Sequence, residues 1–388
     1  MLRPLRTILT LVTLLVAFAT LSPPRSADTL PLFARDRKLP CSTCHFAFPR
    51  LNQMGMHFKQ NGYRMPGEMG TSPWEKEHFP ISLVGNVGAN WQRTDVDTSG
   101  GLGLRATTTN SAFQQNWVEF HTCGTLAEKV TFHFDNGFAN DTGFLHTGMA
   151  FVQFDDVAKD GALNVKVGIF DGEIPYISDA RRTTMAGYLT SWTQDNRGVE
   201  LNGTQSSWLY AAGVVNSERT MGKAGSTNLN NLENVYAWLS REIGTNLISG
   251  RVRMERQDPR VANKDASTHT QADVSAYICP SSEKFAVIPG FTMEHFSDQD
   301  TQKNINTAML EAIAKFDKDS RWVGTGRFEQ QMIPAAGGAV ALNSTQVALN
   351  LAYYVNQNAR IALDWTHQSQ DQGGPKIDQV QAFVHVAY

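Results

Sequence analysis

The chain has 388 residues, of which 34 are lysine or arginine and 37 are aspartate or glutamate, so its formal net charge is −3. This balance excludes the strongly basic surface of a nucleic-acid-binding protein, and we expect no nucleic-acid partner. Hydrophobic residues make up only 41% of the chain, and few long apolar helical windows follow residue 62. The composition therefore favours one large β architecture over an α/β enzyme.

The N-terminus has the three parts of a secretory signal peptide. Arg3 and Arg6 form a basic start, and residues 7–16 form an apolar run that is too short to span a bilayer. Residues 17–19, Ala-Phe-Ala, match the small-x-small pattern of a cleavage site. We therefore expect residues 1–27 to be a signal peptide and the protein to be exported; an uncleaved N-terminal anchor is the alternative.

A short cysteine motif follows the predicted signal peptide. Residues 41–45 read Cys-Ser-Thr-Cys-His, which is the C-x-x-C-H pattern of c-type haem attachment. Two thiols at this spacing add to the two vinyl groups of one porphyrin, and the adjacent histidine supplies an axial nitrogen to the iron. We predict one covalent haem c, bound through Cys41 and Cys44, with His45 as the proximal iron ligand. A zinc site would require a second close ligand pair, and a redox dithiol would require a βαβ context; the sequence has neither.

The haem segment is predicted at residues 28–78. Apolar side chains at i, i+3 and i+7 predict one short helix over residues 50–62, with Gly62 as its C-cap. A distal methionine would raise the reduction potential of the haem relative to a second histidine. Met65, which lies in a loop before a proline, is the first candidate for this ligand, and Met54 is the second, although core packing explains Met54 better. An open or water-ligated iron is a further alternative. The other residues within reach are Met56, His57, Met69 and His78.

From residue 79 to residue 388 the sequence alternates between apolar and polar residues with a period of two. Segments of about 10 residues with this alternation are typical of transmembrane β-barrels. We predict an all-β fold, an outer-membrane antiparallel β-barrel of about sixteen strands, preceded by the small helical haem segment. The strands are expected near 82–93, 112–122, 128–135, 148–155, 162–170, 197–203, 207–215, 234–241, 246–255, 272–279, 284–294, 306–316, 321–329, 345–355, 359–366 and 379–388.

The connections between these segments support a barrel. Long polar gaps, such as 171–196 and 216–233, alternate with short ones, such as 203–206, as extracellular loops alternate with periplasmic turns in outer-membrane barrels. An even strand number then places both ends of the wall in the periplasm. The last segment, 379–388, alternates and ends on the aromatic Tyr388, which resembles the assembly signal of such barrels. A soluble β-sandwich or jelly roll is the alternative.

Three further features follow if the barrel is correct. Cys123 and Cys279 fall near short turns at the periplasmic end, where they either pair or remain free thiols. His385 is expected to face the lumen near the periplasmic mouth, where it is an ordinary polar lumen residue. The alternative is that it binds the haem iron or supports a ligand of that iron. The remaining histidines are scattered along the sequence and show no metal-ligand spacing.

The order of these parts resembles the fused monohaem cytochrome–porins, whose best-known members are the outer-membrane iron-oxidising cytochromes. The resemblance is carried by Pro-Leu-Phe-Ala-Arg at 31–35, by the haem motif at 41–45, by Phe-Pro-Arg-Leu-Asn at 48–52 and by Asn-Gly-Tyr at 61–63. In detail it covers residues 31–67, and beyond them it concerns the architecture alone.

This resemblance implies electron transfer across the outer membrane, with the haem segment on the periplasmic side or in the lumen. The implied partners are a periplasmic cytochrome or other electron carrier, an extracellular redox partner and the outer-membrane lipid. Fe(II) is the best-known donor, which would make the protein an extracellular Fe(II) oxidase, although no residue here specifies iron. The alternative function is a solute channel in which the haem segment is a plug or a sensor.

Overall fold

The computed structural model describes most of the chain after residue 31. The predicted signal peptide at 1–27 lies outside the described residues, and so do Met69 and His78. The described residues are 32–65, 67–68, 70–76, 79–97, 105–138, 146–172, 174–175, 177–178, 181–190, 195–217, 234–257, 267–280, 283–297, 302–335, 341–356, 358–372 and 374–387.

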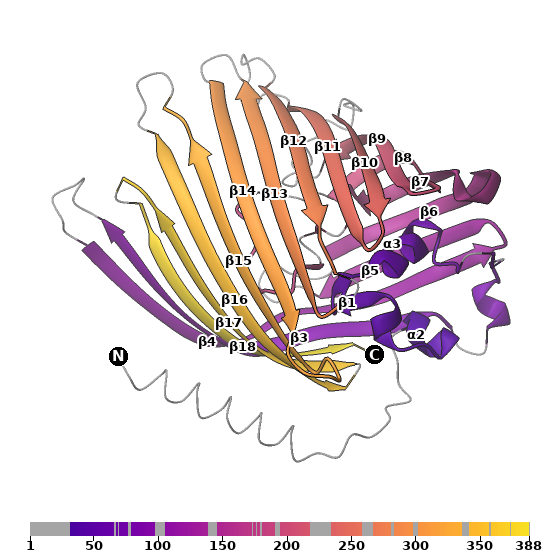
Figure 1. Ribbon diagram of the computed structural model, residues 1–388, viewed down its shortest axis with the longest axis horizontal. Helices are drawn as coiled ribbons and strands as arrows, with labels where there is room; N and C mark the ends of the chain where they lie inside the picture. The colour runs from indigo at the N-terminus through magenta and orange to yellow at the C-terminus, as the bar shows by residue number, and fades with distance from the viewer. Residues whose placement is uncertain are drawn as a thin grey trace.

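Sixteen antiparallel strands, β3 to β18, form a closed barrel (Figure 1). Each strand pairs with the next, and β18 closes the ring on β3 with Val384 opposite Val87. The strands are β3 (Ile81–Asp97), β4 (Arg105–Ala127), β5 (Val130–Phe138), β6 (His146–Ala158), β7 (Leu163–Asp171), β8 (Asp195–Gln205), β9 (Trp208–Ser217), β10 (Asn234–Ile243), β11 (Asn246–Gln257), β12 (Ser267–Tyr277), β13 (Phe285–Ser297), β14 (Gln302–Lys315), β15 (Trp322–Ile333), β16 (Leu342–Asn356), β17 (Ala359–Gln370) and β18 (Lys376–Ala387).

The predicted fold class is confirmed, and the predicted strands correspond one to one to those of the barrel. The observed strands extend further at the end with the long connections; β4, for example, starts at Arg105 rather than near residue 112. At that end the strands are made of polar residues, which pair through their backbones although the alternation of apolar and polar residues has ended; Thr107, for example, lies opposite Asp95. Both ends of the wall, Ile81 and Ala387, lie at the other end, which we call the short-turn end.

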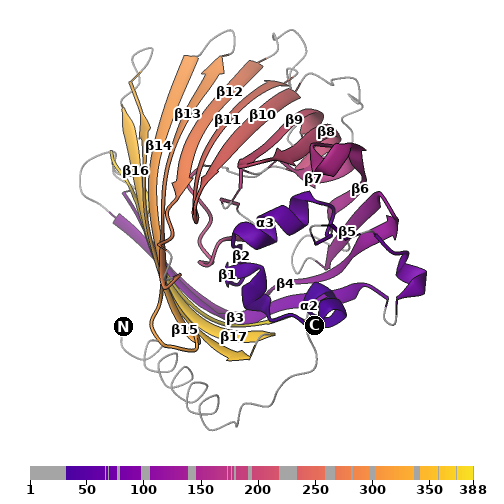
Figure 2. The same cartoon turned by 45° about the vertical axis from the view of Figure 1, so that its right-hand side comes forward.

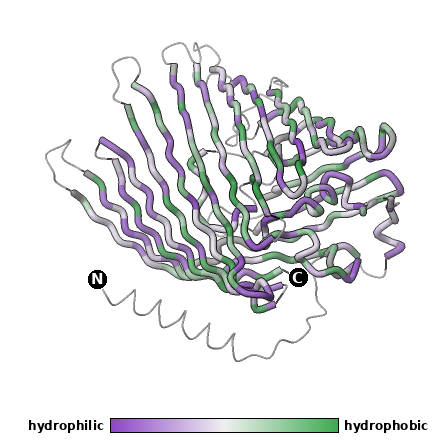
Figure 3. The backbone as a smooth tube through the Cα atoms, in the orientation of Figure 1, coloured by the Kyte–Doolittle hydropathy of each residue, from purple (hydrophilic) through white to green (hydrophobic). Residues whose placement is uncertain are grey.

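The wall has an apolar outer face and a polar inner face, and β10 shows the pattern most clearly. Val235 and Leu239 are exposed on the outside, while Tyr236, Trp238 and Ser240, which alternate with the exposed positions, are buried. Figure 3 shows the same alternation along neighbouring strands. An outward apolar band with a polar interior is the arrangement of barrels that lie in lipid.

The described part of the segment predicted to bind haem lies at the short-turn end, partly within the ring of strands (Figure 2). Its longest element is α3 (Gln53–Gln60), which begins at the N-cap Asn52 and is followed by Gly62 at a φ of 64°. The helix expected over 50–62 is therefore confirmed in a shorter form, with Gly62 in the left-handed conformation of a helix stop. The other elements are α2 (Leu32–Arg37), η1 (Cys41–Thr43), β1 (His45–Ala47), β2 (Arg50–Leu51) and η2 (Pro73–Glu75). The second helix, α2, was not predicted.

The haem segment reaches the wall on two opposite sides. Gln60 Nε2 donates to the carbonyl oxygen of Gly203 on β8 at 2.9 Å, and the hydroxyl of Tyr63 forms a hydrogen bond with the ring of His133 on β5. On the other side the carbonyl oxygen of Phe48 accepts hydrogen bonds from Tyr354 on β16 and Arg360 on β17. None of the helices in the described part of the chain has the length and apolar content that crossing a bilayer requires.

Part of the long connection between β7 and β8 enters the lumen. Its residues 181–190, which we call the inward loop, are bonded to β15, β16 and β17, far from the strands that they connect. The sequence predicted an extracellular loop at 171–196. The difference arises because buried charged side chains on the far wall bind the backbone of this loop.

Candidate functional site

The haem motif forms a compact turn against the start of α3. The backbone N–H of Asn52 donates to the carbonyl oxygen of Cys44 at 2.9 Å. The side-chain amide of Asn52 donates to the carbonyl oxygens of Ser42 and Thr43 at 3.2 and 3.0 Å, and its oxygen accepts the N–H of Gly55 at 2.9 Å. A Cβ atom at position 55 would overlap the carbonyl oxygen of Cys44. One asparagine and one glycine therefore fix the cysteine turn on α3.

Cys41 and Cys44 are half-buried on this turn, and neither forms a disulfide. Burial and, to a smaller extent, the neighbouring Cys44 raise the pKa of Cys41 to about 11. Burial also raises the pKa of Cys44, against the opposing effect of the Arg37 charge. Both thiols are therefore protonated at neutral pH. Two such thiols on one turn are the groups that addition to two vinyl groups requires.

His45 presents one ring nitrogen for ligation. Its Nδ1 lies 3.2 Å from the carbonyl oxygen of Pro49, and a carbonyl can only accept, so Nδ1 carries the hydrogen. The lone pair is then on Nε2, which is the tautomer that a second-sphere carbonyl fixes in metal-ligating histidines. Burial, together with the charge of Arg181, lowers the pKa of His45 to about 4. The ring is thus neutral at neutral pH, as an iron ligand must be.

Phe48 connects the motif to the wall. Its ring lies between the rings of His45 and His385, with centroid distances of 5.1 and 5.0 Å. Its carbonyl oxygen accepts hydrogen bonds from the Tyr354 hydroxyl and from Arg360 Nη1, both at 2.8 Å. His385 is buried on the inner face of β18, as its position in the last strand predicted. It lies beside Phe48 at the short-turn end, in the same region as the haem motif.

Arg50 joins three parts of the molecule. Its guanidinium is fully buried and forms an ion pair with Glu311 on β14. The same group donates to the hydroxyl of Tyr188 in the inward loop at 3.2 Å. Arg327 Nη1, on the neighbouring strand, lies 3.8 Å from Glu311 Oε2. The haem segment, the inward loop and the wall therefore meet around one buried carboxylate.

A small aromatic core holds the haem segment together. The ring of Phe33 lies 4.9 Å from both Phe58 and Tyr63. Arg37 covers the Phe58 ring at 5.1 Å, donates to the carbonyl oxygen of Tyr63 at 3.2 Å and pairs with Glu68. These contacts join the two helices, so the segment has packing of its own in addition to its contacts with the wall.

The two candidate distal ligands lie at opposite ends of α3. Met54 is partly exposed in the first turn of α3, and Met65 is partly buried in the loop after the helix, where its N–H donates to Glu68 Oε2 at 2.8 Å. Met56 is buried, and its sulfur accepts a hydrogen bond from Arg181 at 3.8 Å. The identity of the distal ligand stays a prediction.

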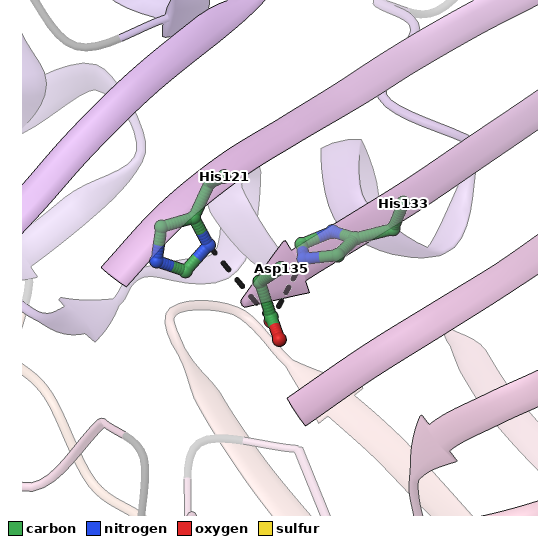
Figure 4. Close-up of side chains that lie close together, drawn as sticks. All are labelled: His121, His133 and Asp135. Atoms are coloured by element: carbon green, nitrogen blue, oxygen red, sulfur yellow. Dashed lines mark hydrogen bonds and ion pairs between the residues drawn. The ribbon is translucent and has the colours of Figure 1, made fainter. Parts of the chain in front are cut away.

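A cluster of two histidines and an aspartate, which the sequence did not reveal, lies on the inner face of β4 and β5. His121, His133 and Asp135 each place a potential ligand atom within 4.8 Å of the others (Figure 4). The strand register brings them together, because His121 is opposite Asp135 and Cys123 is opposite His133. The sequence shows His133 and Asp135 two positions apart and hence on one face of a strand, but the position of His121 depends on the register of the hairpin.

The other two cysteines lie on the barrel wall and its turns, apart from the haem motif. Cys123 and Cys279 are buried free thiols near short turns and do not form a disulfide. Cys123 lies in the last part of β4, and Cys279 lies just after β12. Their predicted position near short turns is confirmed.

Comparison with known proteins identifies the fold. No protein-family model matches the sequence, and no curated protein sequence matches it. The structure is similar to the outer-membrane channel DcaP of Acinetobacter baumannii, with a TM-score of 0.57 and 13% identity over 80% of this chain and 97% of that one. It is also similar to an anion-selective porin from Comamonas acidovorans (TM-score 0.56, 13% identity, 79% and 99% covered). For OmpT of Vibrio cholerae the TM-score is 0.54 and the identity 9%, with 79% of this chain and 98% of OmpT covered. The chain therefore has the fold of outer-membrane porins.

Proposed function

We propose that this protein is a monohaem c-type cytochrome built into an outer-membrane barrel and that it transfers electrons across that membrane. The observation that carries the proposal is the geometry of the motif. Two cysteines that form no disulfide and a neutral imidazole, whose Nδ1 is bound to a carbonyl oxygen, lie on one turn, and that turn is held in the lumen by Phe48 and Arg50. The donor set and its burial fit a haem attached through Cys41 and Cys44 with His45 on the iron.

Haem bound there supplies a reversible one-electron couple. The contributions of the chain are positional and electrostatic. Asn52 and Gly55 fix the turn, Pro49 orients His45, and the lumen wall shields the site from bulk solvent. Because burial and axial ligation set the potential of a haem, these contacts also determine which redox partners are useful. We propose an extracellular donor or acceptor, with Fe(II) as the donor that the family resemblance suggests, and a periplasmic cytochrome as the other partner.

The outward apolar face of the wall supports placement in the outer membrane, with both ends of the wall in the periplasm. In that orientation the haem segment lies in the periplasmic half of the lumen. A redox partner in the periplasm then needs to approach only the short-turn end, whereas an extracellular partner has to reach into the lumen or use a small soluble carrier.

Vectorial electron transfer in proteoliposomes tests the proposal. The full chain is reconstituted around a trapped periplasmic cytochrome, and Fe(II) is added outside. We expect reduction of the trapped cytochrome by the wild type and its loss in the Cys41→Ala/Cys44→Ala variant. The Cys123→Ser/Cys279→Ser variant is the matched control and should retain the flux. No flux with a haem-loaded wild type, in either orientation and with either direction of transfer, would contradict the proposal.

A solute channel is the second candidate function, because DcaP is described as a channel and the Comamonas protein as an anion-selective porin. In this chain the lumen contains both the haem segment and the inward loop, each held by buried ion pairs or hydrogen bonds. A channel predicts single-channel conductance that persists in the Cys41→Ala/Cys44→Ala variant. An electron conduit predicts low conductance in the wild type.

A further inference from the structure

The lumen wall contains a second cluster of ligand-type side chains that haem attachment does not use. His121 on β4 and His133 and Asp135 on β5 face the lumen, and His133 and Asp135 are buried. Asp135 Oδ2 lies 3.2 Å from His133 Nε2 and 3.8 Å from His121 Nδ1. Figure 4 shows the two rings on either side of the carboxylate. Two nitrogens and one oxygen therefore converge on one small volume.

The atoms that point away from this volume are held by other groups. His121 Nε2 lies 3.1 Å from Glu119 Oε2, and His133 Nδ1 lies 2.7 Å from the hydroxyl of Tyr63. The Oδ1 atom of Asp135 accepts the backbone N–H of Met149 at 2.5 Å. Each of the three side chains thus has an outer partner that fixes its orientation. In metal sites such partners hold the ligands and set the histidine tautomers.

The two contacts of His121 place a ring nitrogen and a carboxylate oxygen where a positive charge is needed between them. A carboxylate only accepts hydrogen bonds, so the bond to Glu119 places a hydrogen on Nε2 of His121. In the neutral ring the lone pair on Nδ1 then faces Asp135 Oδ2, and two acceptors 3.8 Å apart repel unless a positive charge lies between them. A proton on Nδ1 satisfies this requirement, and so does a metal ion.

We propose that His121, His133 and Asp135 bind one divalent first-row transition-metal ion at the contact between the barrel wall and the haem segment. Two imidazoles and a carboxylate are a ligand set for Zn(II), Fe(II) and related ions, with open positions for water. Separations of 3.2 and 3.8 Å are those of atoms that each lie about 2.1 Å from a shared ion. The carboxylates of Asp135 and Glu119 supply charge that offsets the charge of the ion.

Tyr63 makes the site dependent on the haem segment. For His133 to ligate through Nε2, its Nδ1 must carry the hydrogen and donate it to the Tyr63 hydroxyl, which accepts as readily as it donates. The ring of Tyr63 stacks on Phe33 of α2. A bound ion would therefore connect two wall strands to the haem segment through one hydrogen bond. The ligands themselves belong to the wall, so the proposal does not depend on haem attachment.

Zinc binding to the full-length chain in detergent, after treatment with a chelator, tests the proposal. Isothermal titration should give one Zn(II) per chain, and zinc-edge X-ray absorption should show imidazole and oxygen ligands about 2.0–2.1 Å from zinc. His133→Gln and Asp135→Asn should each lose this zinc. His367→Gln is the matched control, because His367 pairs with Asp378 at 2.8 Å but lies outside the cluster. It should bind one zinc as the wild type does.

Tyr63→Phe provides a test that leaves every ligand in place. The variant should still bind one zinc, with an affinity 10- to 100-fold lower, as is typical for loss of an outer partner of a ligating histidine. An unchanged affinity would overturn the role of Tyr63. A wild type that binds no stoichiometric zinc, or equal binding by the wild type and Asp135→Asn, would overturn the site itself. The absence of stoichiometric zinc from the wild type is observed without any variant, so a folding defect cannot hide that result.

Discussion

The haem segment and the inward loop both occupy the lumen, but they are held there in different ways. The haem segment has two helices and an aromatic core formed by Phe33, Phe58 and Tyr63. The inward loop has no strand and no α-helix over residues 181–190. Its path is set almost entirely by side chains of the opposite wall. A lumen can therefore be filled by a small folded unit or by backbone that the wall itself immobilises.

The contacts of the two regions show the difference in detail. Arg327 Nη2 donates to the carbonyl oxygens of Ala186 and Gly187 at 2.8 and 2.7 Å, and Gln346 donates to the carbonyl oxygen of Gly187 at 2.6 Å. Glu329 accepts the backbone N–H of Leu189 at 3.1 Å. The backbone polar groups of the loop are thus satisfied by the wall, whereas those of α3 are satisfied within the helix.

Replacement of Arg327 by glutamine should have the largest effect, and the effect should be greatest in the inward loop, whose backbone Arg327 binds directly. The variant loses the guanidinium between Glu311 and Glu329 and the bonds to the loop backbone, and breaking a buried ion pair costs about 3–5 kcal/mol. We expect faster proteolysis within residues 181–190 and a larger single-channel conductance.

Arg360→Gln is the matched control for this prediction. Arg360 is equally buried on the wall, but it binds the carbonyl oxygen of Phe48 in the haem segment. It should leave proteolysis of the inward loop unchanged. Equal loop cleavage in both variants would show that Arg327 has no specific role in holding the inward loop.

The same difference explains what the sequence could predict. The helix over 50–62 and its stop at Gly62 follow from local spacing, and the sixteen strands follow from alternation, since both patterns lie within short stretches of chain. The inward course of residues 181–190 depends on Arg327, Glu329 and Gln346, which are about 140 residues away or more. His121 likewise met His133 and Asp135 only through strand register. Positions set by distant wall residues leave no local pattern in the sequence.

Gly55→Ala should disturb the haem segment alone. The added Cβ meets the carbonyl oxygen of Cys44, a backbone atom that cannot move without displacing the motif. Overpacking of this kind costs about 1–3 kcal/mol. The fraction of chains that stain for covalent haem after denaturing electrophoresis should fall. Gly187→Ala, in the inward loop, is the control, because nothing lies within 4 Å of its added Cβ. A normal haem yield in Gly55→Ala would contradict the observed packing.

Asn52→Ala should have a smaller effect in the same region. It removes the N-cap of α3 and the two bonds to the motif carbonyls. Loss of an N-cap costs about 0.5–2 kcal/mol. We expect reduced haem yield at elevated growth temperature and recovery in Asn52→Asp, which restores the cap but not the amide donors. Equal yields in Asn52→Ala and Asn52→Asp would show that the cap contributes little.

Tyr354→Phe should have the smallest effect. One of the two hydrogen bonds to the Phe48 carbonyl oxygen is lost, while that from Arg360 remains. A single hydrogen bond contributes about 0.5–1.5 kcal/mol. Urea unfolding of the protein in lipid vesicles should detect a decrease of this size, with the midpoint potential of the haem nearly unchanged. A loss of haem attachment in this variant would mean that the wall, rather than the segment's own packing, positions the motif.

The proposed attachment of haem to the lumen segment is tested most directly by the intact mass of the mature exported chain after alkylation under denaturing conditions. Of the four cysteines, Cys41 and Cys44 should be blocked by thioether bonds, and Cys123 and Cys279 should be alkylated. The predicted mass is that of the chain with one haem and two alkyl groups. A chain without haem in which Cys41 and Cys44 are both alkylated would contradict the proposed cytochrome and leave a porin-like barrel with a haem-free segment in its lumen.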